Sequence, residues 1–150
     1  MTSMALRDDI ESGESYFIVE IKSLKRILEE SKKREPLLCI IDEVLRGTNT
    51  VERIAASSRI LNALRQKWVL PFATHDIELS YILDSQYENY HFEEDVQEKE
   101  VVFSYVLKNG RATSRNAIQL LDMLGYDKEI VEDARNAAFN FENKGIWDAL

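Results

Sequence analysis

The sequence predicts an α/β fold in which helices flank parallel strands and the chain ends in helices. Two almost continuous apolar runs, from Leu37 to Ile41 and from Trp68 to Ala73, are typical of strands covered on both faces of a parallel sheet. Helical periodicity precedes, separates and follows them, as the crossovers between parallel strands require. With 150 residues, 45% of them apolar, the chain is long enough for one compact unit that buries ~70% of its unfolded surface.

The first helix is predicted from apolar residues at helical spacing, namely Phe17, Ile21, Leu24 and Leu28. It is expected to end in the basic run from Lys32 to Arg34, which suits a helix C-terminus, and to stop before Pro36. The strand from Leu37 to Ile41 follows and ends at two carboxylates, Asp42 and Glu43.

A capping box predicts the next helix, because Asn49 is followed three residues later by Glu52. This helix is expected to extend to about Lys67. The second apolar run then leads to Thr74, His75 and Asp76. Pro71 removes a ladder donor within that run and counts against a regular central strand there.

The pattern changes to an antiparallel strand pair, because residues 86–92 and 100–107 are rich in Tyr, Phe and Val. One face of the second strand is expected to carry Val101, Phe103, Tyr105 and Leu107. Ser114 is expected to cap a helix that runs to Leu124 with Gly125 past its end. Asp127 is expected to cap a final helix, so the chain should end as a helical pair.

Charge and cysteine content limit the class of protein. Nineteen Lys and Arg against 27 Asp and Glu give a net charge of −8, so any grip on DNA is expected mainly from parts outside this chain. The single cysteine, Cys39, lies in an apolar run and fits a reducing, cytoplasmic location. No apolar run approaches ~20 residues and the N-terminus is acidic, so neither membrane contact nor secretion is expected.

The strand ends carry the candidate chemistry. In open α/β sheets ligands bind at the carboxyl edge, where Asp42 would hold Mg²⁺ and Glu43 would polarise an attacking water. His75 follows the neighbouring strand and would face a phosphate or its water at the same edge. The plainer alternatives are acids where a strand meets solvent and a histidine in an ordinary turn. His91, in the acidic strand, is expected to be a surface residue.

A second candidate is the turn from Ser12 to Ser15 before the first helix. A glycine-containing turn at a helix N-terminus exposes backbone donors and a hydroxyl to an anion. The alternative is that Ser15 simply caps the helix.

Four segments in order, SGESYFIVEIKSLKRIL, LLCIIDEVLRGTNTVER, FATHDIEL and LKNGRATSRNAIQLLDMLGYDKEIVEDA, resemble the C-terminal ATPase domain of the MutS family of DNA mismatch repair proteins. The resemblance extends from Met4 to Ala138. It implies part of an ABC-type P-loop NTPase, with D-E-x-x-R-G-T-x-T after the Walker B strand and F-A-T-H after the next.

The resemblance also implies roles for single residues. Asp42 matches the magnesium ligand, Glu43 the catalytic carboxylate and His75 the switch histidine that faces the γ-phosphate of ATP. Thr74 lies in the same motif as His75 and is expected to contact the nucleotide. Ser15 matches the signature serine, which is expected to reach across a homodimer to the nucleotide bound by the partner subunit. The subunit-interface loop is matched by Arg46, Gly47, Thr48, Asn49 and Thr50. Residues 1–113 correspond to ATPase core and residues 114–150 to a helical dimerisation segment.

Two features depart from the family. No G-x-x-x-x-G-K-[ST] phosphate loop (Walker A) is present, so the chain alone is expected to be inactive and to be the C-terminal part of a longer protein. The usual serine, tyrosine, glycine stretch is replaced by residues 114–117, and Val44 and Leu45 also indicate a divergent branch.

Three functions therefore stay open. The first is an ATP-binding and ATP-hydrolysing module of a MutS-like protein that acts in mismatch repair or binds DNA structures. The second is a non-catalytic dimerisation and interaction module. The third, another ABC-type ATPase tail such as those of chromosome-maintenance proteins, would lack the R-G-T-x-T match.

Overall fold

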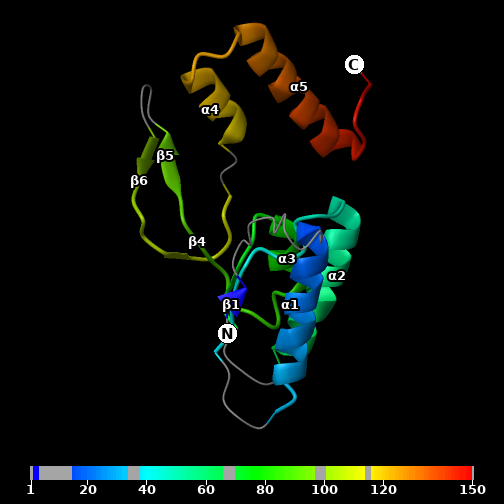
Figure 1. The fold of residues 1–150 in the computed structure, drawn as a ribbon. Coiled ribbons are helices and arrows are strands. Elements are labelled where there is room, and N and C mark those ends of the chain that lie inside the picture. The colour runs from blue at the N-terminus through cyan, green and yellow to red at the C-terminus, as the bar shows by residue number, and fades with distance from the viewer. Residues whose placement is uncertain are drawn as a thin grey trace. The chain divides into compact units, whose positions relative to one another are not determined.

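The computed structural model describes residues 2–3, 15–33, 38–65, 70–96, 101–113 and 116–149. They divide into two compact units, Met1–Asn89 and Tyr90–Leu150 (Figure 1). The first unit contains a parallel sheet with helices, and the second contains antiparallel ladders and two helices. The described structure is thus mixed α/β, as the sequence predicts, but the prediction of one compact unit is wrong, because the contacts divide it into two.

The sheet of the first unit has the order β1-β2-β3, with β1 at Thr2–Ser3, β2 at Ile40–Asp42 and β3 at Phe72–Ala73. Both pairings are parallel. The two later strands are shorter than their apolar runs, and the parts of those runs at Leu37 and at Trp68 lie outside the described residues. The carbonyl of Pro71 accepts the Ile41 N–H at 3.2 Å, so the proline still takes part in the pairing of the two strands as an acceptor, although it cannot donate.

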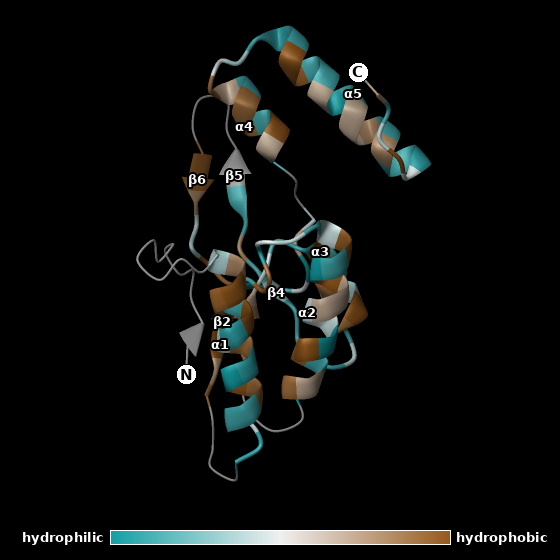
Figure 2. Cartoon of the chain, turned by 45° about the vertical axis from the view of Figure 1, so that its right-hand side comes forward, coloured by the Kyte–Doolittle hydropathy of each residue, from teal (hydrophilic) through white to brown (hydrophobic). Residues whose placement is uncertain are grey.

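Three helices accompany this sheet: α1 (Tyr16–Glu30), α2 (Thr50–Leu64) and α3 (Ile77–Ile82). In Figure 2 both α1 and α2 carry hydrophilic and hydrophobic residues, and amphipathic helices gather the hydrophobic ones on the face that meets the core. The Asn49 side chain accepts the Glu52 N–H at 3.0 Å, which confirms the predicted cap of α2. The prediction that α1 ends in the basic run from Lys32 to Arg34 is wrong, because the helix already ends at Glu30.

The core of the first unit joins these helices to one face of the sheet. Ile27 of α1, Leu61 of α2 and Leu79 of α3 are fully buried, together with Ile41 of β2. Cys39 is buried as predicted, and burial raises the pKa of its thiol. The prediction that β2 is covered on both faces is wrong for the described residues, because Ile40 remains 44% exposed. The helices cover only the face to which Ile41 points.

The second unit has two short antiparallel ladders. β4 (Tyr90–His91) pairs with β7 (Lys108–Asn109), and β5 (Glu94–Val96) pairs with β6 (Val101–Phe103). The antiparallel arrangement is confirmed, but the predicted single pair of long strands is wrong. Tyr105 adopts a positive φ of 53°, which breaks the alternation expected through Leu107.

The chain ends in α4 (Ala117–Met123) and α5 (Lys128–Lys144), as predicted. Gly125 follows α4 with φ of 80°, the left-handed conformation that glycine adopts without strain. Asp127 is the N-cap of α5 but makes no side-chain cap hydrogen bond. The predicted cap Ser114 lies outside the described residues, and Asn116 is the N-cap of α4.

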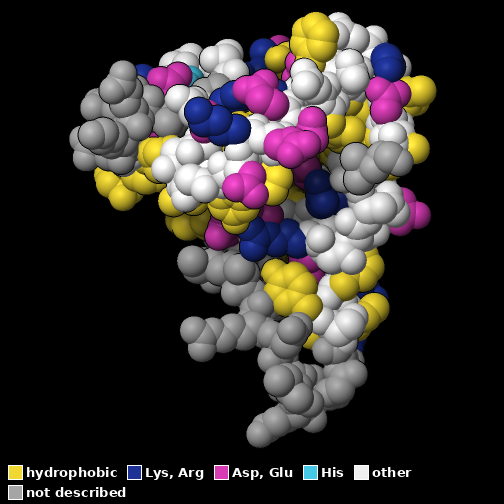
Figure 3. Space-filling view, turned by 90° about the horizontal axis from the view of Figure 1, so that it is seen from above, with side chains coloured by type: hydrophobic (Ala, Val, Ile, Leu, Met, Phe, Trp, Pro, Cys, Tyr) yellow, Lys and Arg dark blue, Asp and Glu magenta, His cyan; other side chains and the backbone are white. Residues whose placement is uncertain are grey.

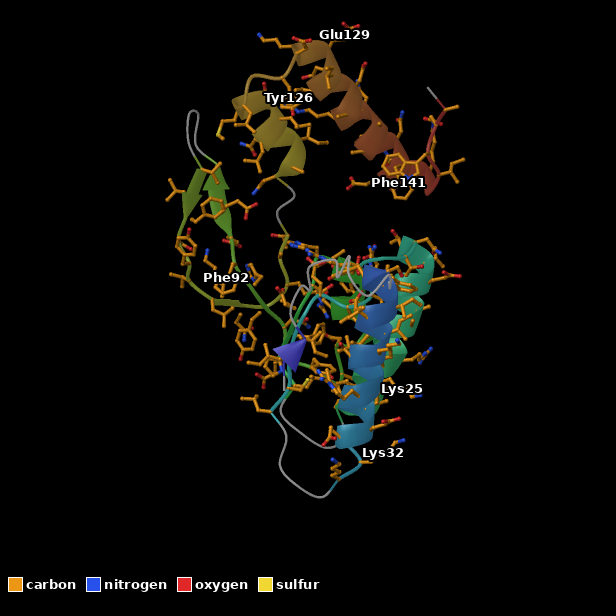
Figure 4. The ribbon with its side chains drawn as sticks, in the orientation of Figure 1. Lys25, Lys32, Phe92, Tyr126, Glu129 and Phe141 are labelled. Carbon is orange, nitrogen blue, oxygen red and sulfur yellow. The ribbon has the colours of Figure 1, made fainter. Side chains whose placement is uncertain are left out.

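Side chains join the two terminal helices. Arg135 of α5 contacts Asp122 of α4 at 2.9 Å. Phe141, labelled in Figure 4, stacks on Trp147 with ring centroids 4.2 Å apart.

None of the described helices combines the length and the apolar composition that crossing a bilayer requires.

His91 is not the surface residue that the sequence predicts, because its side chain is only 11% exposed. Nδ1 lies 2.9 Å from the Gly110 carbonyl oxygen and Nε2 lies 2.8 Å from Glu93 Oε1. Glu93 also accepts a hydrogen bond at 2.5 Å from Lys108 Nζ. The pKa of His91 is raised, chiefly by Glu93 and then by the Gly110 carbonyl, and that of Glu93 is lowered, chiefly by Lys108.

We predict that Glu93→Gln lowers the pKa of His91, because the neutral amide no longer favours the imidazolium. In the unaltered chain the pair stabilises the β4–β7 ladder fully below about pH 6.5, the unfolded pKa of histidine, and this contribution is lost as the pH rises through the raised folded pKa. An NMR titration of the His91 ring measures the pKa, and chemical denaturation at several pH values measures the stability. Glu129→Gln, on α5, is the control; equal titration of His91 in all three proteins would contradict the pairing.

Candidate active site

The site forms where β2 and β3 end side by side. Their register pairs Ile41 with Phe72 and Asp42 with Ala73, so the residues that follow emerge at one edge of the sheet. There, Nε2 of His75 lies 3.5 Å from Oε1 of Glu43. The Glu43 side chain is 16% exposed and the His75 side chain 94%, so the carboxylate is sheltered while the imidazole is open to a ligand.

Arg46 binds the Glu43 carboxylate with two donors, its Nε and its Nη2. This hydrogen bonding is the main reason that the pKa of Glu43 is lowered, and the positive charge of Arg46 and the nearby His75 add to it. Glu43 is therefore ionised at neutral pH and is oriented by its neighbour.

A second arginine fixes the turn that carries His75. Arg53 of α2 donates to both carboxylate oxygens of Asp76, at 2.8 and 2.6 Å. The Asp76 N–H in turn donates to Thr74 Oγ1 at 3.0 Å. Sequence reasoning missed Arg53 and Asp76, because only the tertiary fold brings the first turn of α2 to the end of β3.

Of two hollows lined by described residues of the first unit, the smaller carries the candidate chemistry. It measures about 130 Å³ and is lined by Glu43, Val44, Arg46, Arg53, Thr74, His75 and Asp76. The larger, about 380 Å³, lies between α1 and α2 and is walled mainly by apolar side chains such as Phe17, Leu28 and Ile60. Lys25, labelled in Figure 4, also reaches that wall. The smaller hollow brings Glu43 and His75 together at the carboxyl edge of β2 and β3, so it is the candidate active site.

Ser15 is exposed at the N-cap of α1 and makes no side-chain cap hydrogen bond. Its carbonyl oxygen accepts the N–H groups of Ile18 at 2.9 Å and Val19 at 3.3 Å. These are the ordinary first bonds of the helix, so the Ser15 side chain does not perform the capping role that the sequence left open. Ser12, Gly13 and Glu14 lie outside the described residues.

Comparison with known proteins shows the family to which the chain belongs. The model of MutS domain V matches residues 1–142. The chain belongs to the MutS family. It is 31% identical over 135 residues to the DNA mismatch repair protein MutS of Thermus thermophilus, covering 89% of this chain and 16% of the relative.

A second relative gives the same result. The chain is 32% identical over 154 residues to the DNA mismatch repair protein MutS of Aquifex pyrophilus, covering 99% of this chain and 18% of that protein. The chain therefore spans less than a fifth of the length of these curated relatives.

The loop from Arg46 to Thr50, predicted as a MutS subunit-interface loop, lies against the first turn of α1. A Cβ atom placed on Gly47 would lie 2.8 Å from Phe17 Cβ, closer than atoms in contact allow. Thr48 Oγ1 donates to Glu52 Oε2 at 3.1 Å, and Asn49 Nδ2 donates to the same oxygen at 2.7 Å. The loop is thus fixed to both α1 and α2.

We predict that Gly47→Ala destabilises the chain by about 1–3 kcal/mol, because the added methyl group must displace the rigid Cβ end of Phe17. Chemical denaturation measures the change. Phe17→Ala keeps Cβ but removes Cδ2 and Cγ, which would lie 3.0 and 3.2 Å from the added methyl group, so the double variant should lose less stability than the sum of the two single variants. Simple additivity would contradict a clash with the Phe17 ring.

Proposed function

We propose that this chain supplies the hydrolytic residues of a MutS-type ATPase of the ABC-type P-loop class. The observation that carries the proposal is the sheltered, ionised Glu43 beside His75 at the carboxyl edge of two parallel strands. Glu43 polarises the attacking water and His75 senses the γ-phosphate, with Thr74 beside it. ATP is the nucleotide by resemblance to the family.

Asp42 fits the role of the magnesium ligand. It is an exposed residue at the end of β2, and nucleotide-site Mg²⁺ is usually held by one or two carboxylates together with phosphates and water. Among the described residues no three His, Cys, Asp or Glu side chains group into a metal cage. Bound there, the ion would neutralise charge on the phosphates.

The active form we propose is a homodimer. The Ser15 hydroxyl is exposed and is not used to cap its own helix, which suits a group that reaches the nucleotide of a partner subunit. The loop from Arg46 to Thr50 would lie at the same interface. Residues 114–150 would add a dimerisation surface, since α5 exposes Ile130 and Phe139.

DNA is proposed to bind mainly to parts of the protein outside this chain. On the face drawn in Figure 3, the Lys and Arg side chains of the described residues alternate with Asp and Glu and form no basic stripe. The net charge of −8 agrees with this.

The alternative function, a non-catalytic dimerisation module, is favoured by one observation: the 150 residues contain no Walker A sequence. ATP affinity measured with and without a chain that supplies a phosphate loop separates the two functions. We use the term complete ATPase for these 150 residues together with a phosphate loop, which the same polypeptide or a second one supplies.

We predict that Glu43→Gln in the complete ATPase leaves nucleotide binding nearly intact and slows hydrolysis by about 10²-fold or more, because it removes the carboxylate that orients and polarises the attacking water. Asp42→Ala should instead weaken binding of Mg²⁺-nucleotide. Single-turnover hydrolysis and equilibrium binding distinguish the two effects. Glu52→Gln, at the start of α2, is the control for a lost carboxylate. An equal loss of binding in both site variants would contradict the assignment.

We predict that Ser15 acts across the dimer. When Ser15→Ala subunits are mixed with Glu43→Gln subunits, each mixed dimer should contain one site with both lesions and one intact site. ATPase activity should therefore exceed that of either variant alone. Activity equal to the average of the two variants would show that Ser15 serves its own subunit.

A further inference from the structure

Glu20 is a buried carboxylate that the proposed chemistry does not use. It lies on α1 five residues after Ser15 and is only 5% exposed. Its Oε1 accepts the backbone N–H of Leu45, while Oε2 is buried without a hydrogen-bond partner in the described part of the chain. Glu20 therefore connects α1 to the loop that follows Glu43.

Packing alone does not explain a glutamate here. Burial raises the pKa of Glu20, against the lowering effect of the Leu45 and Arg46 backbone amides. A leucine of similar size would fill the space with no carboxylate to desolvate, and such replacements of buried charges are often neutral or stabilising. What leucine lacks is an acceptor for the Leu45 N–H.

The loop needs such an acceptor because its backbone is unusual. Glu43 and Leu45 both have φ of 58°, a left-handed conformation that side chains other than glycine rarely adopt. Between them, the Val44 carbonyl oxygen accepts a hydrogen bond from Ser57 Oγ of α2 at 3.4 Å. The loop is thus held from α1 by Glu20 and from α2 by Ser57, and strained backbone persists only where its surroundings fix it.

We infer that Glu20 is a positioning residue, which fixes the Val44–Leu45 backbone so that Arg46 meets the Glu43 carboxylate and Glu43 faces His75. The inference rests on the proposed ATPase function. Ser15 lies at the start of the same helix. Glu20 therefore also links α1, whose Ser15 is proposed to reach the nucleotide of the partner subunit, to Glu43 of its own subunit.

The test compares Glu20→Leu, which fills the space without an acceptor, with Glu20→Gln, which keeps an acceptor oxygen. In the complete ATPase we expect Glu20→Leu to lower kcat by about 10- to 100-fold with little change in KM, because the carboxylate is misplaced. Glu20→Gln should retain most of kcat. Ile27→Val, buried on the same helix seven residues further on, is the control for altered packing.

A second measurement does not depend on turnover. Amide hydrogen exchange in the unaltered chain should show Leu45 protected, and Glu20→Leu should speed its exchange by about 10-fold or more relative to the Leu61 amide of α2, while Ile27→Val should not. Unchanged kcat and unchanged Leu45 protection in Glu20→Leu would overturn the inference, as would equal losses in the Leu and Gln variants. Failure of Glu43→Gln to slow hydrolysis would instead overturn the proposed function.

Discussion

The parallel pairing of β2 with β3 is the constraint on which the site depends. The Glu43 N–H donates to the Ala73 carbonyl oxygen at 2.9 Å, so the last bond of the ladder already involves the candidate catalytic residue. Beyond it both strands leave the sheet, and the two chain directions diverge at the carboxyl edge. A shift of one residue in this register would turn Ile41 away from the core and move Glu43 relative to His75. Core packing and site geometry are therefore set by the same few hydrogen bonds.

Charge at this edge is balanced by two arginines with different tasks. Arg53 and Asp76 form a pair whose side chains are 23% and 14% exposed, so it links α2 to the turn after β3 with limited competition from water. Arg46 is more exposed and pairs with Glu43, whose pKa it lowers. A carboxylate with a lowered pKa is a weak proton acceptor. Glu43 therefore suits the orientation and polarisation of a water in phosphoryl transfer, which depends mainly on positioning and electrostatics.

Much of this could be predicted from local sequence signals. Helical periodicity, the Asn49 cap and the two apolar runs identify the helices and the parallel strands, and parallel pairing then places Glu43 and His75 at one edge. The signals fail where tertiary contacts decide. The partners of Arg53 and of Glu20 lie 23 and 25 residues away in sequence, and no periodicity encodes them. His91 is polar and lies in an acidic stretch, yet the fold shelters it between Glu93 and the Gly110 carbonyl.

The backbone at Leu45 explains how the loop can be both strained and stable. A left-handed conformation costs a residue other than glycine about 1–2 kcal/mol. Leu45 is 5% exposed and belongs to the core cluster, and full burial of a leucine side chain contributes about 1.5–3 kcal/mol. The two effects are of similar size, so packing of the side chain offsets the strain that the backbone stores. Glycine at position 45 would relieve the backbone strain but would lose the buried leucine side chain. In this member of the MutS family, the conformation of the loop beside Glu43 is therefore tied to the hydrophobic core between α1 and α2 as well as to the Glu20 carboxylate.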